Sequence, residues 1–262
     1  MNDFLKWKSR VLSRIDLSKK GSIDAAIQNL VSFINEQHGY CTTSSCSGRI
    51  VLLSNDAEQS GGSGINQKKT KKCTWHLVSH ETVELHDVLK SLHQVKCESK
   101  LKFEGFIMHI KCCGLEEARL MQNAAISTGY RNSGITLGKQ GRNIMVAVRG
   151  TQCLEVPITD VHGARLTSDL YIKCVLDKAN QKLKDNFERI VLFETKLRSL
   201  INNSRFSENK TCKKLSNSSF SKKGNRKHKG ENPGHLQNEI DVDDVKFLFS
   251  NGGDVGTFLV MF

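Results

Sequence analysis

The stretch YCTTSSCSGRIVLL spans residues 40–53 and joins a row of hydroxyl residues to a strand-like apolar run. A helix is predicted before it, because Ser22 can serve as an N-cap and apolar residues recur at helical spacing up to Gly39, which suits a C-cap. A strand is predicted at Ile50–Leu53, the apolar end of the stretch. The polar residues between them are therefore expected to form a turn where a helix leads into a strand.

The second half of the chain repeats this order. A strand is predicted over residues 103–110, then a helix over 115–125 that ends at Gly129. The polar turn Tyr130–Gly134 follows, and strands are predicted at 144–149 and 153–156. The pattern predicts a mixed α+β fold, with a mixed β-sheet packed by helices, and it hints at an internal duplication.

Two regions divide the chain by composition. Residues 166–201 predict one long helix or two joined helices, because they contain no Pro or Gly between charged and apolar positions. We predict a folded domain over 1–201, with a flexible basic loop at 54–72, and a mostly disordered tail over 202–262. The tail is basic up to residue 230, where nine Lys/Arg face one acid, and acidic over 231–254, where six acids face one Lys.

The net charge favours a polyanionic partner. Of 262 residues, 39 are Lys or Arg and 27 are Asp or Glu, which gives +12. Nucleic acid is the common partner of such a chain, although a protein with an alkaline pI and no such partner has the same balance. The longest apolar runs are far shorter than the roughly 20 residues of a membrane span, so no membrane association is expected.

The nine cysteines predict reduced thiols rather than disulfides or a metal centre. They form no Cys-x-x-Cys pair, and the N-terminus has no apolar core of the kind a signal peptide carries. We therefore expect a cytoplasmic protein. His76 and His80 could share one face of a strand and bind a metal, but satisfied strand histidines are the favoured interpretation and no metal is expected.

Residues 42–49 are the strongest candidate for a ligand-binding loop. Hydroxyl groups can face outward there, Gly48 allows close approach, and Arg49 can bind a carboxylate or phosphate. The alternative is a Ser-rich turn that satisfies its own backbone. Cys46 could be a nucleophile but has no His or Asp partner nearby in the sequence.

A second polar turn, Arg131-Asn-Ser-Gly134, suits contacts with anions or base edges, although a plain helix cap has the same residues. Glu155 stands among apolar strand residues and needs a partner if it is buried. The chain has no Gly-x-Gly-x-x-Gly after a strand and no P-loop. A nucleotide-type cofactor cannot be predicted from those fingerprints.

Taken in order, several motifs resemble those of one known family. They are Asp16-Leu-Ser18-x-Lys20-Gly-Ser-Ile-Asp24, Thr43-Ser-Ser-Cys-Ser-Gly-Arg-Ile50, Leu101-Lys-Phe-Glu104, Gly129-Tyr-Arg-Asn-Ser-Gly-Ile135, Val146-Ala-Val-Arg149 and Leu154-Glu-Val-Pro157. The chain is similar over about residues 3–200 to the tRNA wybutosine-synthesizing protein 3 family. It departs at Gly150, where a Ser is expected, and at Tyr130, where Phe is usual.

The resemblance implies an S-adenosylmethionine-dependent methyltransferase with a mixed α/β fold that is not the Rossmann methyltransferase fold. Its substrate would be N-4 of the 7-aminocarboxypropyl-demethylwyosine precursor, next to the anticodon of phenylalanine tRNA. The oligomeric state stays open.

Site roles follow as expectations. Cofactor binding is assigned to Ser44, Ser45, Ser47, Gly48 and Arg49, with Arg49 on the donor carboxylate. The catalytic candidates are Cys46, His109 and Glu155. The RNA-binding candidates are Lys20, Tyr130, Arg131, Asn132, Ser133 and Arg149, together with the lysines of 68–72. Tyr130, Phe103 or Trp75 could stack on the base, and the two turns should share one cleft.

The sequence leaves three alternatives open for the site residues and for the function. His109 or Glu104 could accept a proton, but ion pairing of Glu104 and Glu155 with arginines is favoured. The whole chain could be a non-catalytic tRNA-binding module, or a thiol or metal enzyme built on Cys46, His76 and His80.

Overall fold

The computed structural model describes residues 2–13, 21–56, 72–138, 141, 143–216 and 260–261. Two compact units are distinguished, one over 1–202 with 258–262 and one over 203–257. The helices are α1 (Asn2–Leu12), the 3-10 turn η1 (Ala25–Ile27), α2 (Gln28–Glu36), α3 (Leu85–Leu92), α4 (Leu115–Ser127) and α5 (Asp169–Ser216). The strands are β1 (Tyr40–Cys46), β2 (Arg49–Asp56), β3 (Lys72–Ser79), β4 (Ser99–Glu104), β5 (Ile107–Cys112), β6 (Gly134–Leu137), β7 (Ile144–Arg149), β8 (Cys153–Thr159) and β9 (Val260–Met261).

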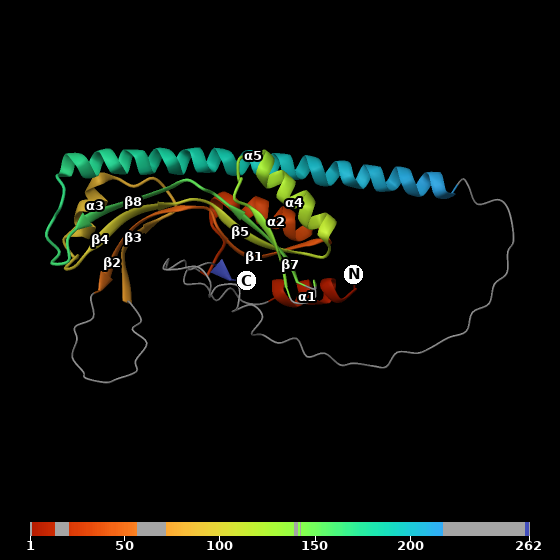
Figure 1. The fold of residues 1–262 in the computed structure, drawn as a ribbon, viewed down its shortest axis with the longest axis horizontal. Coiled ribbons are helices and arrows are strands. Elements are labelled where there is room, and N and C mark those ends of the chain that lie inside the picture. The colour runs from red at the N-terminus through yellow and green to blue at the C-terminus, as the bar shows by residue number, and fades with distance from the viewer. Residues whose placement is uncertain are drawn as a thin grey trace, which may run out of the picture. The chain divides into compact units, whose positions relative to one another are not determined.

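The strands of the first unit form two antiparallel sheets. Sheet A has the order β6-β7-β5-β1-β9, and sheet B has the order β3-β2-β4-β8 (Figure 1). Every strand pairing that the structure describes is antiparallel. The helices α2, α4 and the part of α5 up to residue 202 cover one side of the sheets, and α1 lies on the other side.

Three chain segments pass from one sheet into the other with only two or three residues between strands. We call this line the seam; it consists of Ser47-Gly48 between β1 and β2, Gly105-Phe106 between β4 and β5, and residues 150–152 between β7 and β8. Gly48 has φ of +99°, and a Cβ there would lie 2.9 Å from the Asn186 side-chain nitrogen. Glycine is therefore required where the backbone turns and α5 approaches closely.

Asn186 of α5 forms hydrogen bonds with two backbone groups of the seam. Its Nδ2 donates to the carbonyl of Ser47 at 2.7 Å, and its Oδ1 accepts from the N–H of Phe106 at 2.8 Å. The side chain is 3% exposed. Backbone groups that lose their sheet partners at the seam are satisfied in this way by one helix residue.

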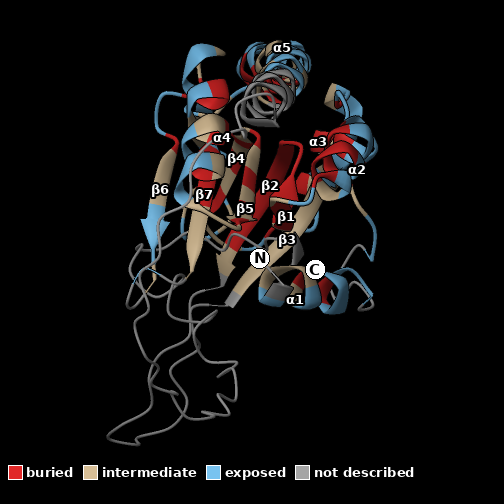
Figure 2. Ribbon diagram, turned by 90° about the vertical axis from the view of Figure 1, so that its right-hand side faces the viewer, coloured by how far each residue is buried: buried red, intermediate tan, exposed pale blue. Residues whose placement is uncertain are grey.

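Two hydrophobic cores lie between the sheets and the helices. The core of sheet A combines Met108, Ile110 and Val146 with α2, α4 and residues such as Phe193 of α5. The core of sheet B combines Ile50 and Leu101 with α3 and the N-terminal half of α5. Figure 2 shows the buried residues concentrated where the strands meet these helices. One helix thus contributes to both cores.

Alternation along the strands leaves the other side of the sheets for polar and charged residues. On β5, Met108, Ile110 and Cys112 are buried in the core, whereas His109 and Lys111 alternate with them and are only half-buried. Because successive strand residues point to opposite faces, these two belong to the side turned away from α2, α4 and α5. We call this side the outer face. Helix α1 lies on it, where the Lys111 ammonium is 3.9 Å from the centre of the Trp7 ring.

The predicted α+β class and the absence of a Rossmann fold are confirmed, and three corrections follow. Two antiparallel sheets replace the expected mixed sheet. Residues 40–46 form strand β1 instead of a loop, because their small side chains fit between buried neighbours in the sheet. The strand expected over 103–110 is two strands, separated at Gly105-Phe106. The internal duplication stays a prediction.

Boundaries also differ from those expected. Helix α5 is one helix from Asp169 to Ser216 and continues past residue 201. Strands β2 and β3 take up both ends of the predicted loop 54–72, and residues 57–71 lie outside the described residues. The tail at 217–259 also lies outside them. Within the described residues, no helix has both the length and the apolar character needed to cross a membrane.

Candidate active site at the seam

The turn between β1 and β2 is held by two side chains that are distant in sequence. Asp24, just before η1, accepts a hydrogen bond from the N–H of Ser47 at 2.8 Å. His80, just after β3, lies with Nδ1 2.9 Å from the carbonyl oxygen of Gly48 and 3.3 Å from Asp24 Oδ2. The Ser-Gly turn is therefore fixed from both sides.

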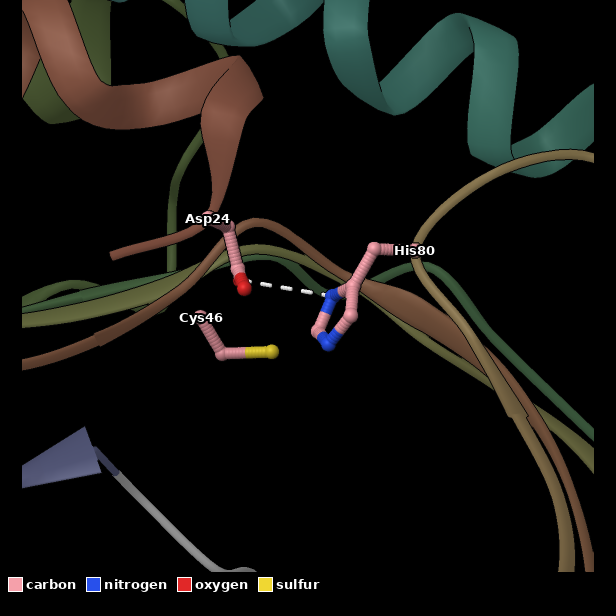
Figure 3. Close-up of side chains that lie close together, drawn as sticks. All are labelled: Asp24, Cys46 and His80. Atoms are coloured by element: carbon pink, nitrogen blue, oxygen red, sulfur yellow. Dashed lines mark ion pairs between the residues drawn. The ribbon is translucent and has the colours of Figure 1, made fainter. Parts of the chain in front are cut away.

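Cys46 completes a cluster with these two residues. One donor atom from each of Asp24, Cys46 and His80 lies within 4.8 Å of the others. Figure 3 shows that they come from three separate segments, and that the Cys46 sulfur points toward the imidazole. A carboxylate, a thiol and an imidazole could hold a metal ion or move a proton.

The thiol of Cys46 is in its neutral form near pH 7. Burial, only partly offset by the Arg49 charge, raises its pKa to about 11. Because the thiolate is the nucleophilic form, this environment does not favour the predicted nucleophilic role. The structure does supply the His and Asp neighbours that the local sequence lacked.

Ser44 and His109 meet on the outer face of sheet A. They are paired across β1 and β5, and Ser44 Oγ lies 3.0 Å from His109 Nδ1. Burial, helped by the charge of Arg149, lowers the pKa of His109 to about 4. The imidazole is therefore neutral at physiological pH and is a weak base.

Ser45 lies on the opposite side from Ser44. It pairs with Met108, which belongs to the core, and its hydroxyl is buried without a hydrogen-bond partner in the described part of the chain. The sequence grouped Ser44, Ser45 and Ser47 as cofactor ligands because a loop could present all three. In a strand, neighbouring side chains point to opposite faces, so Ser45 points toward the helices while Ser44 points to the outer face.

Arg49 begins β2 and lies between an acid and an aromatic ring. Its Nε donates to Glu104 Oε2 at 2.7 Å, and its guanidinium carbon lies 4.6 Å from the centre of the Trp75 ring. The residue is 7% exposed. The favoured pairing of Glu104 with an arginine is what the structure describes, and the two terminal nitrogens of Arg49 remain the groups that could bind a carboxylate.

Glu155 belongs to an ion-pair cluster away from the seam. Lys100 and Lys102 lie 3.1 Å and 2.9 Å from its carboxylate. The hydrogen bond from Lys102 is the main cause that lowers the pKa of Glu155. A carboxylate held ionised in this way is a poor proton carrier, so the arrangement favours a structural role over the predicted catalytic one.

The predicted RNA-binding turn lies at the far edge of sheet A. Arg131 and Asn132 are exposed, and Arg149 is exposed at the end of β7. Ser133 is buried instead, and its Oγ accepts a hydrogen bond from the N–H of Arg149 at 3.2 Å. Ser133 thus links the turn to β7 and is not presented to a ligand.

Stacking on a nucleobase is excluded for two of the three aromatic candidates. Tyr130 is 1% exposed and packs 5.4 Å from Phe106 and 5.7 Å from Phe193, between ring centres. Phe103 is also 1% exposed, in the core of sheet B. Both rings pack inside the hydrophobic cores, so their faces are not accessible to a nucleobase. Trp75 lies next to Arg49, while Lys20 and lysines 68, 69 and 71 lie outside the described residues.

One row of paired residues connects the two polar motifs. Ser44 pairs with His109, His109 with Ala147, and Ala147 with Gly134, from β1 across β5 and β7 to β6. Neighbouring strands lie about 4.8 Å apart, so the three steps span roughly 14 Å. Two cavities among the described residues are lined by α5 and by the C-terminal end of α4, and neither contains a predicted site residue, so neither is the expected common cleft.

Sequence reasoning missed the roles of Asp24 and His80. The sequence gives Asp24 no role within its motif, and it places His80 only with His76, and with Cys46 in the alternative of a thiol or metal enzyme. His76 instead lies with Nε2 2.8 Å from Ser54 Oγ. No local signal joins residues 24, 46 and 80, because they come from separate segments that the tertiary fold brings together at the Ser47-Gly48 turn.

The comparisons with known proteins agree with this architecture. Residues 6–199 match the family described as Methyltransferase TYW3. A tRNA wybutosine-synthesizing protein 3 homolog from Danio rerio is 43% identical over 192 residues, which cover 73% of each chain. The Homo sapiens homolog is 42% identical over 193 residues, covering 73% of this chain and 71% of that protein. The Pongo abelii homolog is 37% identical over 249 residues, covering 92% and 93%.

Solved structures show the same fold. The PH1069 protein from Pyrococcus horikoshii is similar with a TM-score of 0.60 and 25% identity, over 76% of this chain and 92% of that chain. A hypothetical protein from Aeropyrum pernix is similar in fold with a TM-score of 0.56 and 22% identity, over 68% and 99%. Because the family match covers residues 6–199 and the relatives exceed 30% identity over most of both chains, this chain belongs to the TYW3 methyltransferase family and is a methyltransferase.

Proposed function

We propose that the protein transfers a methyl group from S-adenosylmethionine to N-4 of the 7-aminocarboxypropyl-demethylwyosine precursor in phenylalanine tRNA. Membership of the family and the names of its relatives give the chain a role in the wybutosine modification of tRNA. The donor, the nitrogen that is methylated and the identity of the tRNA are the parts we propose, as is a cytoplasmic location.

The observation that carries the proposal is the row across sheet A. Ser44, Cys46 and Arg49 lie at or beside the seam, and Arg149 lies two strands from Cys46, because Ile107 pairs with both. The row from Ser44 to Gly134 spans roughly 14 Å, which accommodates a small charged donor beside a flat base. Methyl transfer from a sulfonium needs mainly this placement of two reactants, since the donor is already activated.

The residues at the seam fit the chemistry of the donor. Arg49 offers two terminal nitrogens to a carboxylate while Glu104 and Trp75 fix its orientation. Ser44 and Ser47 are buried, with their hydroxyls 3.0 Å from His109 Nδ1 and 3.4 Å from His80 Nδ1, so binding a ribose or an amino group would require them to exchange these contacts. Gly48 allows the tight turn that places these residues, because its φ of +99° disfavours any other residue and Asn186 fills the space where a Cβ would lie.

Exposed charged residues of sheet A and of the turn after α4 fit the tRNA. Arg149 and Arg131 are exposed and carry no ion pair among the described residues, so they are available to phosphates. Lys100 and Lys102 already share Glu155, which reduces their net contribution.

The test is an assay on phenylalanine tRNA that carries the undermethylated precursor, read by mass spectrometry of the nucleosides. We expect a gain of one methyl that requires S-adenosylmethionine. Arg49→Ala should weaken donor binding in calorimetry by about tenfold or more, the order expected for losing a charged hydrogen bond.

Arg165→Ala is the matched control, because Arg165 pairs with Asp169 on the surface and should leave donor binding unchanged. An unchanged precursor mass with wild-type protein would reject the proposed reaction. Tight tRNA binding without donor binding would favour a non-catalytic tRNA-binding module.

A further inference from the structure

We propose that His80, held by Asp24, accepts the proton that the acceptor ring nitrogen loses during methyl transfer. The inference rests on the proposed function, because it assigns a role within that reaction. It is carried by the cluster of Asp24, Cys46 and His80 at the Ser47-Gly48 turn (Figure 3).

The contacts of His80 define which ring nitrogen is basic. Nδ1 lies 2.9 Å from the carbonyl oxygen of Gly48 and 3.3 Å from the carboxylate of Asp24. These two nearest neighbours can only accept hydrogen bonds, and the Ser47 hydroxyl, 3.4 Å from Nδ1, can accept as well, so Nδ1 carries the hydrogen in the neutral ring. The lone pair is therefore on Nε2, and Nε2 is the atom that takes a proton.

Asp24 is placed to stabilise the protonated ring. It is 2% exposed, and the N–H of Ser47 fixes its Oδ2 at 2.8 Å. A buried carboxylate beside Nδ1 holds the ring in one tautomer and favours the imidazolium when it forms, as in an Asp–His pair of a hydrolase. Asp24 is thus a positioning residue and does not itself meet the substrate.

The other candidate bases are less suited. Burial lowers the pKa of His109 to about 4, which makes it a weak proton acceptor. Glu155 is held by two lysines, and the Cys46 thiol has a pKa of about 11 and keeps its own proton. His80 combines an accessible edge, with 26% of its side chain exposed, and a carboxylate partner.

The step balances without any further reactant. The lone pair of the acceptor nitrogen forms the new N–CH₃ bond while the S–CH₃ bond of the donor breaks, and that electron pair leaves with sulfur as a neutral thioether. The N–H proton passes to Nε2 of His80. The resulting imidazolium is paired with Asp24 until the proton returns to water.

The charged and titratable groups around the ring set its pH dependence. They are Asp24 before η1, Cys46 on β1, Glu81 on the same loop, and the Arg49–Glu104 pair, both members of which act on Cys46. Three of these groups, Asp24, Glu81 and Glu104, are acids, and Arg49 is the one cation among them. We therefore expect Asp24, the group in direct contact, to dominate.

The experiment measures the single-turnover rate on precursor tRNA with saturating donor. His80→Gln should lower the rate constant by about 10²-fold or more, with donor and tRNA dissociation constants within twofold of wild type. His76→Gln is the control, because His76 lies on β3, the strand that leads to His80, and contacts Ser54 instead of the cluster. His80→Gly should regain rate when imidazole is added, which a purely structural role would not allow.

The pH profile separates the two roles. A base must be neutral, so the wild-type rate should fall tenfold per unit as pH drops below the pKa of His80. His80→Gln should lose this fall. Asp24→Asn keeps an acceptor for Ser47 but removes the charge that favours imidazolium, so the fall should move to lower pH.

Each outcome bears on a different claim. A wild-type protein that methylates, with a fully active His80→Gln variant, overturns the role of His80 and leaves the proposed function intact. A wild-type protein that methylates nothing rejects the proposed function itself. Zinc found at one equivalent, lost in Cys46→Ser and His80→Gln and required for activity, would make the cluster a metal site and overturn the proton role.

Discussion

The hydroxyl group of Tyr130 forms no hydrogen bond with the described residues. The side chain is buried, and its Oη has no hydrogen-bond partner in the described part of the structure. Tyr130→Phe should raise the free energy of unfolding by about 1 kcal/mol, because a buried, unsatisfied hydroxyl is removed while the ring packing stays. Urea unfolding measures the change, and methyl transfer should be unaffected. A loss of stability would show that the hydroxyl is satisfied in solution.

The thiol of Cys46 should resist alkylation at neutral pH. With a pKa of about 11, only about one molecule in 10⁴ is thiolate at pH 7, and that fraction rises tenfold per pH unit. Iodoacetamide labelling followed by peptide mass spectrometry should modify the exposed Cys153 first and Cys46 only as pH approaches 10. Fast labelling of Cys46 at pH 7 would contradict the buried, neutral state.

His109 should make the fold sensitive to acid. Its pKa of about 4 lies below the unfolded value of about 6.5, so the unfolded chain binds the extra proton between these values. Stability is therefore lost as pH falls from 6.5 toward 4, by roughly 3 kcal/mol at most. His109→Gln should flatten this part of the stability curve, measured by urea midpoints at several pH values. An equally steep curve in the variant would assign the loss to other groups.

At the scale of elements, the sequence predicted most of the strands and the long helix, but it did not predict where one strand ends and the next begins. The apolar runs at 50–53 and 144–149 predicted strands because β-branched residues fill a pleated surface. The sequence predicted one strand over 103–110, because nothing local reveals the break at Gly105. A Cβ at this position would lie 3.1 Å from the carbonyl oxygen of Gln152, a contact between residues distant in sequence. Helices α1 and α3 were not predicted.

The candidate site was foreseen only where its residues are adjacent in sequence. The motif of residues 43–50 was identified, but its strand conformation turns Ser45 away from Ser44. Asp24 and His80 join it through tertiary folding. Tyr130 was predicted for stacking because composition does not tell an exposed aromatic residue from a core one.

Asn186 tests the role of α5 in joining the sheets. Asn186→Ala leaves the Ser47 carbonyl and the Phe106 N–H buried without their partner, which should cost about 2–4 kcal/mol of unfolding free energy. Gln181→Ala on the same helix removes only a surface contact with Asp185 and should change stability by less than about 0.5 kcal/mol. Thermal and urea unfolding of the two variants should differ accordingly; equal stability would remove Asn186 from this role.

At the scale of the whole molecule, tRNA binding should depend on salt through the outer face. Arg149→Ala and Arg131→Ala should each reduce the slope of log K against log salt by about 0.7–0.9, the contribution of one phosphate contact. Lys173→Ala is the control, because Lys173 lies on exposed α5 and pairs with Asp177. Filter binding between 50 and 200 mM salt measures the slopes. A larger effect of the control would place the tRNA on the helical side.

The seam has a consequence for how the two sheets come apart. Three covalently continuous segments run through it, and a single amide side chain ties two of them to the long helix. Local unfolding of one sheet should therefore disrupt the other sheet as well. Amide hydrogens of β3 and of β7, far apart in the chain, should exchange with deuterium in one concerted event.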